Sequence, residues 1–269
     1  YILQPVGPSC VGGAVNFENI SGSDANETVR GDINNNKLSG ERGDDAIYGY
    51  AGDDELAAGG WAIFNRSSDS EILGNYVNDS GNTDNDNLYG GAGDDVLYGS
   101  KGDNILDGGV GTDIIYSGDG SDTFVIRSGD GSSDLNTIDV IKDFSDSNDT
   151  FGLDLVNFDD LTIAQGSGNY SNHTLISITS TGEYLFSIEN RSASDITMTD
   201  FASLSTIDQT FSGTDENNTF IGGAGNDTVT TGAGADTIIA SSGDDQITVN
   251  GLGDKTIDGG AGTDSLIIS

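Results

Sequence analysis

Residues 90–97 read Gly90-Gly91-Ala92-Gly93-Asp94-Asp95-Val96-Leu97, and this stretch decides the fold because it recurs along the chain. Further clear copies begin at Gly108, Gly222 and Gly259. Aspartates nine residues apart mark the period in five pairs: Asp45–Asp54, Asp86–Asp95, Asp113–Asp122, Asp227–Asp236 and Asp236–Asp245. A fixed period outranks any single motif, because each repeat is one structural unit that stacks on its neighbours. The sequence therefore predicts a stack of short turns.

Each unit reads Gly-Gly-x-Gly-x-Asp-x-U-x, where U is a large apolar residue. Glycine tolerates positive φ and close backbone approach, so several carbonyl oxygens can point into one tight loop. The aspartate adds a carboxylate to these carbonyls. Oxygen ligands of both kinds, about six to eight of them in loose geometry, are what Ca²⁺ prefers. The turns therefore predict calcium sites.

The second half of the unit, such as Val96-Leu97-Tyr98, is short and should be extended. One turn cannot bury its apolar residue or complete an ion's coordination shell, but a neighbouring turn supplies both. The expected apolar ladder is Ile47, Leu56, Leu88, Leu97, Leu106, Ile115 and Phe124. A flexible acidic linker is disfavoured, because linkers do not keep apolar residues in phase. The prediction is an all-β chain of parallel β-rolls with calcium along both edges.

These repeats resemble the RTX, or haemolysin-type, calcium-binding repeat family, and the resemblance covers most of the chain. It implies that the sixth-position aspartates bridge calcium ions while glycine-rich carbonyls of facing turns complete each shell. The aspartates implied as ligands are Asp45, Asp54, Asp86, Asp95, Asp113, Asp122, Asp227, Asp236, Asp245 and Asp264. The positions implied for the turn carbonyls are Gly90, Ala92, Gly108, Val110, Gly222, Ala224, Gly259 and Ala261.

Some units depart from the pattern. In phase with the aspartates stand Glu27, Asn36, Asn104 and Asn218. Asparagine keeps an oxygen ligand but loses the charge, so Asn36 and Asn104 should belong to weaker sites. Lys255 cannot ligate a cation, and the neighbouring Asp254 is the alternative ligand. An empty or rearranged site is expected there.

The segment Asp139-Val140-Ile141-Lys142-Asp143-Phe144, followed by Asp149, resembles the terminal stretch of RTX rolls, where such aspartates ligate a last calcium. Asp139, Asp143 and Asp149 are therefore further candidate ligands. The alternative is an ordinary β-strand with solvent-facing aspartates.

The charge balance bears on partners and on folding. The chain has 45 acidic and 9 basic residues, a formal net charge of −36, and 7% aromatic residues. Such a chain repels itself and should stay largely disordered without counter-ions. If calcium binds only the folded form, metal binding and folding are one equilibrium. Nucleic acid and anionic membranes are poor partners at this charge.

The expected location is extracellular, on a bacterial cell surface. The single cysteine, Cys10, allows no internal disulfide. This suits a cytosolic protein, or a secreted protein that bound metal ions stabilise in place of disulfides. Weak extracellular-type sites need about millimolar calcium, which favours the exoprotein. No stretch is apolar enough to span a membrane. Both ends, at Tyr1 and Ser269, are expected to continue into a longer protein, and the resemblance implies type I secretion.

Four regions are expected along the chain. Residues 1–20 form an entry segment or the end of a preceding domain, and residues 21–150 form a first roll with an insertion at about 55–85. That insertion, with Trp61, should be a surface excursion rather than a binding face. Residues 151–208 alternate as antiparallel strands and should cap the open sheet. Residues 209–269 form a second roll.

No motif supports catalysis, and no enzyme is expected. His173 is the one histidine, which excludes a His-Glu-x-x-His zinc site, and no nucleophile elbow is present. A carboxylate pair for glycoside hydrolysis stays open in a chain so rich in aspartate.

The first functional hypothesis is a calcium-dependent folding module of a secreted surface-layer, sheath or adhesin-like protein, which self-associates or binds cell-surface polysaccharide. The alternative is the RTX portion of a type I-secreted hydrolase or toxin whose catalytic domain lies outside this chain. A third possibility is a carbohydrate- or surface-binding module that uses Trp61.

Overall fold

The structure is a computed structural model that describes residues 19–60 and 84–269. Within these ranges every regular element is a β-strand or a short 3-10 helix, which confirms the all-β prediction. The 3-10 helices are η3 (Leu135–Thr137), η4 (Phe158–Asp160), η5 (Gly168–Tyr170) and η6 (Met198–Asp200). None of the helices in the described part has the length and apolarity that a membrane crossing requires. Cys10 and Trp61 lie outside the described residues.

The chain forms two compact units. The first comprises Tyr1–Thr150 and Ile163–Ile196, and the second comprises Phe151–Thr162 and Thr197–Ser269. The predicted region 151–208 is thus divided between the two units.

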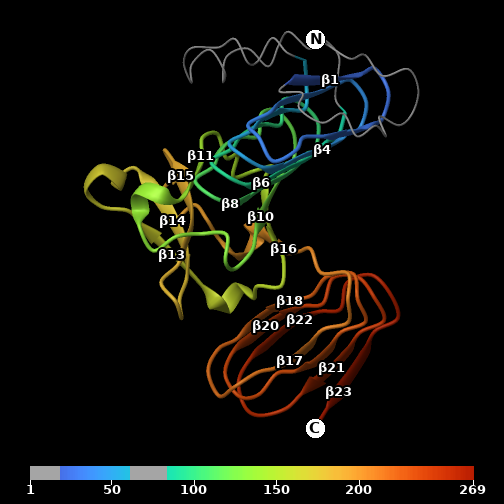
Figure 1. The fold of residues 1–269 in the computed structure, drawn as a ribbon. Helices are drawn as coiled ribbons and strands as arrows, with labels where there is room; N and C mark the ends of the chain where they lie inside the picture. Colours follow the sequence, from blue (N-terminus) through green and yellow to red (C-terminus); the bar gives the residue numbers. More distant parts are fainter. Residues whose placement is uncertain (1–18, 61–83) are drawn as a thin grey trace. The chain divides into compact units, whose positions relative to one another are not determined.

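Two parallel sheets build the array of the first unit (Figure 1). One contains β1 (Asn19–Ser23), β3 (Lys37–Glu41), β5 (Glu55–Ala57), β7 (Val96–Tyr98), β9 (Ile114–Tyr116) and β11 (Asp139–Ile141). The other contains β2 (Thr28–Arg30), β4 (Ala46–Ala51), β6 (Asn87–Ala92), β8 (Ile105–Val110) and β10 (Thr123–Ile126). Each nine-residue unit supplies one strand and one turn, so successive units alternate between the sheets. Residues two units apart are therefore neighbours, as Leu38 and Leu56 are.

The predicted apolar ladder forms the core between these sheets. Ile47, Leu56, Leu88, Leu97, Leu106, Ile115 and Phe124 are all 0% exposed, which confirms the expectation. Burial of each such side chain contributes about 1.5–3 kcal/mol.

The strands on either side of the insertion pair directly. Leu56 of β5 is the partner of Leu97 of β7, and Ile47 of β4 is the partner of Leu88 of β6. The strands before and after the insertion are thus neighbours in both sheets, with their apolar residues in register.

Antiparallel strands close one sheet edge of the first unit. They are β13 (Leu161–Gln165), β14 (His173–Ile178) and β15 (Tyr184–Glu189). β15 pairs in parallel with β11, where Asp139 faces Phe186, and antiparallel with β14. The backbone groups at the β11 edge are therefore paired instead of exposed to another chain.

The second unit contains another pair of parallel sheets (Figure 1), which confirms the prediction of two rolls. One is formed by β17 (Thr210–Ser212), β19 (Thr228–Thr230), β21 (Gln246–Val249) and β23 (Ser265–Ile268). The other is formed by β18 (Thr219–Ile221), β20 (Asp236–Ile239) and β22 (Lys255–Asp258). In the same unit β12 (Thr150–Leu153) pairs with β16 (Phe201–Ser203). Phe220, Val229, Ile238, Ala240 and Ile247 form the core of the second roll.

Candidate metal centre

The in-phase residues form hydrogen-bonded ladders along the edges of the rolls. In the first unit the backbone N–H of Asp54 donates to Oδ1 of Asp95 at 2.6 Å, and the N–H of Asp95 donates to Oδ1 of Asp113 at 2.8 Å. The N–H of Asp113 continues the ladder to Oδ1 of Asp139 at 2.9 Å. The strand register thus places the carboxylate of each ladder aspartate against the backbone N–H of the ladder residue one turn before it in the same sheet.

Four edges are defined by these ladders. In the first unit the Asp45 edge consists of Glu27, Asp45, Asp86, Asn104, Asp122 and Asp149. The Asp54 edge consists of Asn36, Asp54, Asp95, Asp113 and Asp139. In the second unit the Asp227 edge consists of Gln209, Asp227, Asp245 and Asp264. The Asp236 edge consists of Asn218, Asp236 and Lys255.

The second carboxylate oxygen of most ladder aspartates is buried without a hydrogen-bond partner. This holds for Oδ2 of Asp45, Asp54, Asp95, Asp113, Asp122, Asp227 and Asp245. The Oδ2 atom of Asp236 also makes no hydrogen bond, but it forms an ion pair with Lys255. An unpartnered buried polar group costs about 1–3 kcal/mol, and more when it is charged. These oxygens therefore require a cation or a proton.

The unpartnered oxygens of Asp45, Asp54, Asp95 and Asp227 each lie beside a glycine and a carbonyl of the next turn. A β-carbon at Gly90 would collide with Oδ2 of Asp95 and with the carbonyl oxygen of Gly108. The same arrangement recurs at Gly49, where Asp54 supplies Oδ2 and Gly90 the carbonyl. Carboxylate and carbonyl oxygens thus converge where only glycine leaves room, and an all-oxygen donor set of this kind fits Ca²⁺.

Protein carbonyls must supply much of any coordination shell. Among residues 19–60 and 84–269, no group of three or more His, Cys, Asp or Glu side chains gathers in a metal-holding cluster. The ladders instead separate the carboxylates turn by turn, with glycine-turn carbonyls between them.

Burial raises the pKa of eight of the ladder carboxyls in the metal-free protein. The pKa rises to about 8 for Asp45 and to about 9 for Asp139, chiefly by desolvation. The backbone N–H that donates to each carboxylate partly opposes this rise, while nearby acidic residues add to it. The other raised pKa values are about 7 for Asp95, Asp113 and Asp122 and about 6 for Asp54 and Asp149, and the pKa of Asp227 is also raised. Protons and calcium therefore compete for the same oxygens.

Two of the three candidates at the end of the first roll, Asp143 and Asp149, accept a backbone N–H on each carboxylate oxygen. Asp143 accepts the N–H of Ser117 at 2.9 Å and the N–H of Gly118 at 3.1 Å, one on each oxygen. Asp149 accepts the N–H of Asp122 at 3.1 Å and that of Ser145 at 2.7 Å. These two carboxylates thus hold the backbone of the last turn, whereas Asp139 continues the Asp54 edge.

Several candidate carbonyls take part in bonds between turns. The carbonyls of Ala92, Val110 and Ala261 accept N–H groups of Gly52, Gly93 and Gly243, at 2.9, 3.0 and 2.9 Å. The N–H of Ala224 donates to the carbonyl of Ser205 at 2.7 Å. Gly222 and Gly259 lie against Oδ2 of Asp227 and Asp264 respectively, and Asp264 is exposed.

On the Asp45 edge, Asn104 has an amide group, Nδ2, where the neighbouring aspartates have their second carboxylate oxygen, Oδ2. Its Nδ2 donates to the carbonyls of Gly99 at 3.0 Å and Gly102 at 3.1 Å, and to Oδ1 of Asp122 at 3.1 Å. The turn carbonyls that would face a cation are thus bonded to the amide itself.

We expect Asn104→Asp to add a calcium site, because it replaces the amide donor by a carboxylate facing the Gly99 and Gly102 carbonyls. Native mass spectrometry in millimolar calcium should count one more ion per chain. Asn85→Asp is the matched control: Asn85 is exposed and its Oδ1 accepts the N–H of Asp103, so the same charge is added without a buried cradle. An unchanged ion count for Asn104→Asp would contradict the assignment of this position.

A second, exposed ladder was missed by the sequence interpretation. The N–H of Asp94 donates to Oδ1 of Asp53 at 3.1 Å, and the N–H of Thr112 donates to Oδ1 of Asp94 at 3.0 Å. The signal was the Asp-Asp doublet at Asp53-Asp54 and Asp94-Asp95. The first aspartate of each doublet faces solvent and ties the turns together, while the second is buried.

His173 is partly buried. Its Nδ1 lies 2.7 Å from Oγ of Ser187, which is 0% exposed, and its ring packs edge-on against Tyr170. A fully buried serine cannot meet a substrate, so this pair is part of the β14–β15 packing.

Comparisons with known proteins match these turns to a repeat model. The family model for the RTX calcium-binding nonapeptide repeat (4 copies) matches residues 21–60, 80–115, 89–124, 102–132 and 212–247. No curated protein matches the chain. The solution structure of the AlgE6R3 subunit from the Azotobacter vinelandii mannuronan C5-epimerase is 20% identical over 67% of this chain and 80% of that chain. The TM-score between the two structures is 0.27. The chain thus carries RTX calcium-binding nonapeptide repeats in both of its parallel arrays, and these repeats bind Ca²⁺ at multiple sites.

Proposed function

We propose that this chain is a calcium-dependent folding module of a secreted bacterial cell-surface structural protein, of the surface-layer, sheath or adhesin kind, and that it has no catalytic role. The observation that carries the calcium dependence is the set of buried Oδ2 atoms without hydrogen-bond partners along three of the edges. The residues proposed as ligands are the ladder aspartates together with the glycine-turn carbonyls.

Calcium acts on folding through charge. The chain carries a formal net charge of −36, and each buried ladder stacks acidic residues of successive turns, with the backbone N–H of one bonded to the carboxylate of the next. Ions that bind these ladders but not the open chain shift the equilibrium towards the folded form. A chain exported unfolded would then fold where calcium is abundant, which supports a location outside the cell.

The proposed partners are further copies of the chain or a cell-surface polysaccharide. Tyr48 and Tyr89 stack with ring centroids 4.8 Å apart, Tyr48 and Tyr50 stack at 6.0 Å, and Tyr50 is 50% exposed. The Arg30 guanidinium lies 5.4 Å from the Tyr48 ring centre. Partly exposed tyrosine rings, each with a polar hydroxyl group, suit contacts with another copy of the chain and contacts with a polysaccharide.

A calcium titration followed by circular dichroism and light scattering on the same samples tests the proposal. We expect a cooperative gain of β-structure together with growth into large assemblies, because a structural lattice protein should associate once it is folded. Sodium chloride at matched ionic strength separates specific binding from charge screening.

The possible outcomes point in different directions. A folded chain that stays monomeric at all calcium concentrations would contradict the lattice role. It would favour the RTX portion of a secreted hydrolase or toxin, or an adhesin module. A chain with no folding response to calcium would contradict the folding role itself.

A further inference from the structure

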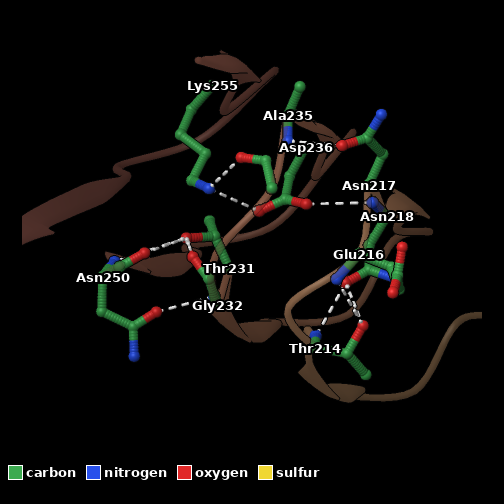
Figure 2. Close-up of polar contacts among 11 residues, drawn as sticks. Thr214, Glu216, Asn217, Asn218, Thr231, Gly232, Ala235, Asp236, Asn250 and Lys255 are labelled. Carbon is green, nitrogen blue, oxygen red and sulfur yellow. Dashed lines mark hydrogen bonds and ion pairs between the residues drawn. The ribbon is translucent and has the colours of Figure 1, made fainter. Parts of the chain in front are cut away.

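The Asp236 edge of the second unit holds a lysine where the other edges continue with carboxylates or amides. Lys255 Nζ lies 2.8 Å from Oδ2 of Asp236 and donates to the carbonyl oxygen of Gly234 at 2.6 Å (Figure 2). The two side chains are 6% and 0% exposed respectively, so this pair is shielded from solvent. A carboxylate oxygen and a glycine-turn carbonyl are the donor types that converge at the calcium cradles.

We propose that the Lys255 ammonium group takes the place of a calcium ion on the Asp236 edge, so that this edge folds around a cation carried by the chain and binds no calcium there. The inference rests on the proposed calcium role of the ladder aspartates.

The strand register places Lys255 at the ladder position. Asp236 of β20 is the direct partner of Lys255 in β22, nineteen residues later, whereas units on the Asp227 edge reach Asp245 after eighteen. The added residue lies in the turn after β21, and it moves Asp254 out of the ladder. The N–H of Asp236 accordingly donates to the backbone carbonyl of Asp254 at 3.2 Å instead of to a carboxylate.

The turn in front of Asp236 is also filled. Thr231 stands five residues before Asp236, where Gly90 stands before Asp95, and it is 0% exposed. Its hydroxyl donates to the carbonyl of Asn250 at 3.2 Å and accepts the N–H of Asn250 at 3.3 Å (Figure 2).

A side chain at this turn position does not by itself close a cradle. Ser117 and Ala240 occupy it before Asp122 and Asp245, whose Oδ2 atoms lack partners. Of these three aspartates, Asp236 alone has both a side chain at the turn position before it and an ammonium group beside its Oδ2 atom. The lysine is therefore the feature that distinguishes this edge.

The charges of the edge balance without a metal ion. The remaining member, Asn218, is neutral: its Oδ1 accepts the N–H of Thr214 at 2.7 Å, and its N–H donates to Oδ1 of Asp236 at 2.9 Å. One ammonium group thus faces one carboxylate, whereas the Asp227 edge has Asp227, Asp245 and Asp264 with no lysine among them. A tethered cation does not depend on the free ion concentration, so the carboxylate of this edge is neutralised without calcium, whereas the other edges of the same roll still require it.

Ion counting on the whole chain tests the proposal. Native mass spectrometry in saturating calcium should give the same number of ions for Asp236→Asn as for the unmodified chain. Asp227→Asn, the matched control on the opposite edge, should lose at least one ion. Loss of an ion on Asp236→Asn would overturn the proposal. If neither variant changed the count, the calcium role of the ladder aspartates would itself fail, which is a different outcome.

A second measurement remains informative if Asp236→Asn folds poorly. Lys255→Met leaves the buried carboxylate without its cation, and truncating one partner of a buried ion pair is strongly destabilising. We expect Lys255→Met to lower the melting temperature, and the added change Asp236→Asn to recover part of that loss, equally at low and saturating calcium. A recovery seen at saturating calcium but absent at the lowest calcium concentration that still folds the chain would show that the pair acts through a bound ion, and it would overturn the proposal.

Discussion

Excess EDTA near neutral pH is expected to abolish the β-structure of both rolls, and millimolar calcium should restore it. Each site that binds only the folded form contributes about 2.7 kcal/mol when calcium is about 100-fold above its Kd. Four such sites would contribute about 11 kcal/mol, which is comparable to the whole stability of an ordinary domain, about 5–15 kcal/mol. Far-UV circular dichroism during chelation and calcium addition measures this change.

Magnesium is the informative control for this experiment. Mg²⁺ demands near-ideal octahedral geometry and gives up its water reluctantly, so turn carbonyls and a single carboxylate fit it poorly. Equal concentrations of MgCl₂ should therefore restore little structure. Full recovery with magnesium would show that charge neutralisation alone folds the chain, and β-structure that survives EDTA would contradict calcium-dependent folding.

Acidification is expected to have the opposite effect on the metal-free protein: lowering the pH from about 8 towards 5 in EDTA should recover β-structure. The pKa values of the buried carboxyls lie at about 8 for Asp45, about 7 for Asp95 and about 9 for Asp139, above the ordinary value of 3.8. The folded state therefore binds more protons than the unfolded chain, so its stability falls as the pH rises through this window. Protons on these carboxyls remove the charge that calcium would otherwise compensate.

The calcium-bound protein should respond to pH in the reverse sense. Calcium must displace protons from the same carboxyls, so the midpoint of the calcium titration should fall as the pH rises from about 5 to about 8. Dilute samples and parallel light scattering are needed at the acid end, because the sequence pI is about 4.1 and a chain near zero net charge associates. A midpoint independent of pH would show that the raised-pKa carboxyls are not the ligands.

The nine-residue period was sufficient to predict much of the fold. A turn that places Leu88, Leu97 and Leu106 at the same phase can bury them only by stacking, and all three are 0% exposed. The alternating residues of β14 and β15 likewise predicted antiparallel strands. The exposed ladder through Asp53 and Asp94 was not predicted, because the repeat pattern assigns a role only to the second aspartate of each doublet.

The sequence by itself determined the repeat, the parallel rolls, the apolar core and the type of ion, because each depends on residues within one unit or at a fixed spacing. Only the tertiary structure decided what each carboxylate meets, because its partner comes from the next turn of the same sheet, eighteen or more residues away. Lys255 illustrates the difference. As a sequence feature it predicted an empty or rearranged site, but one added residue in the preceding turn places it opposite Asp236, where it fills that site.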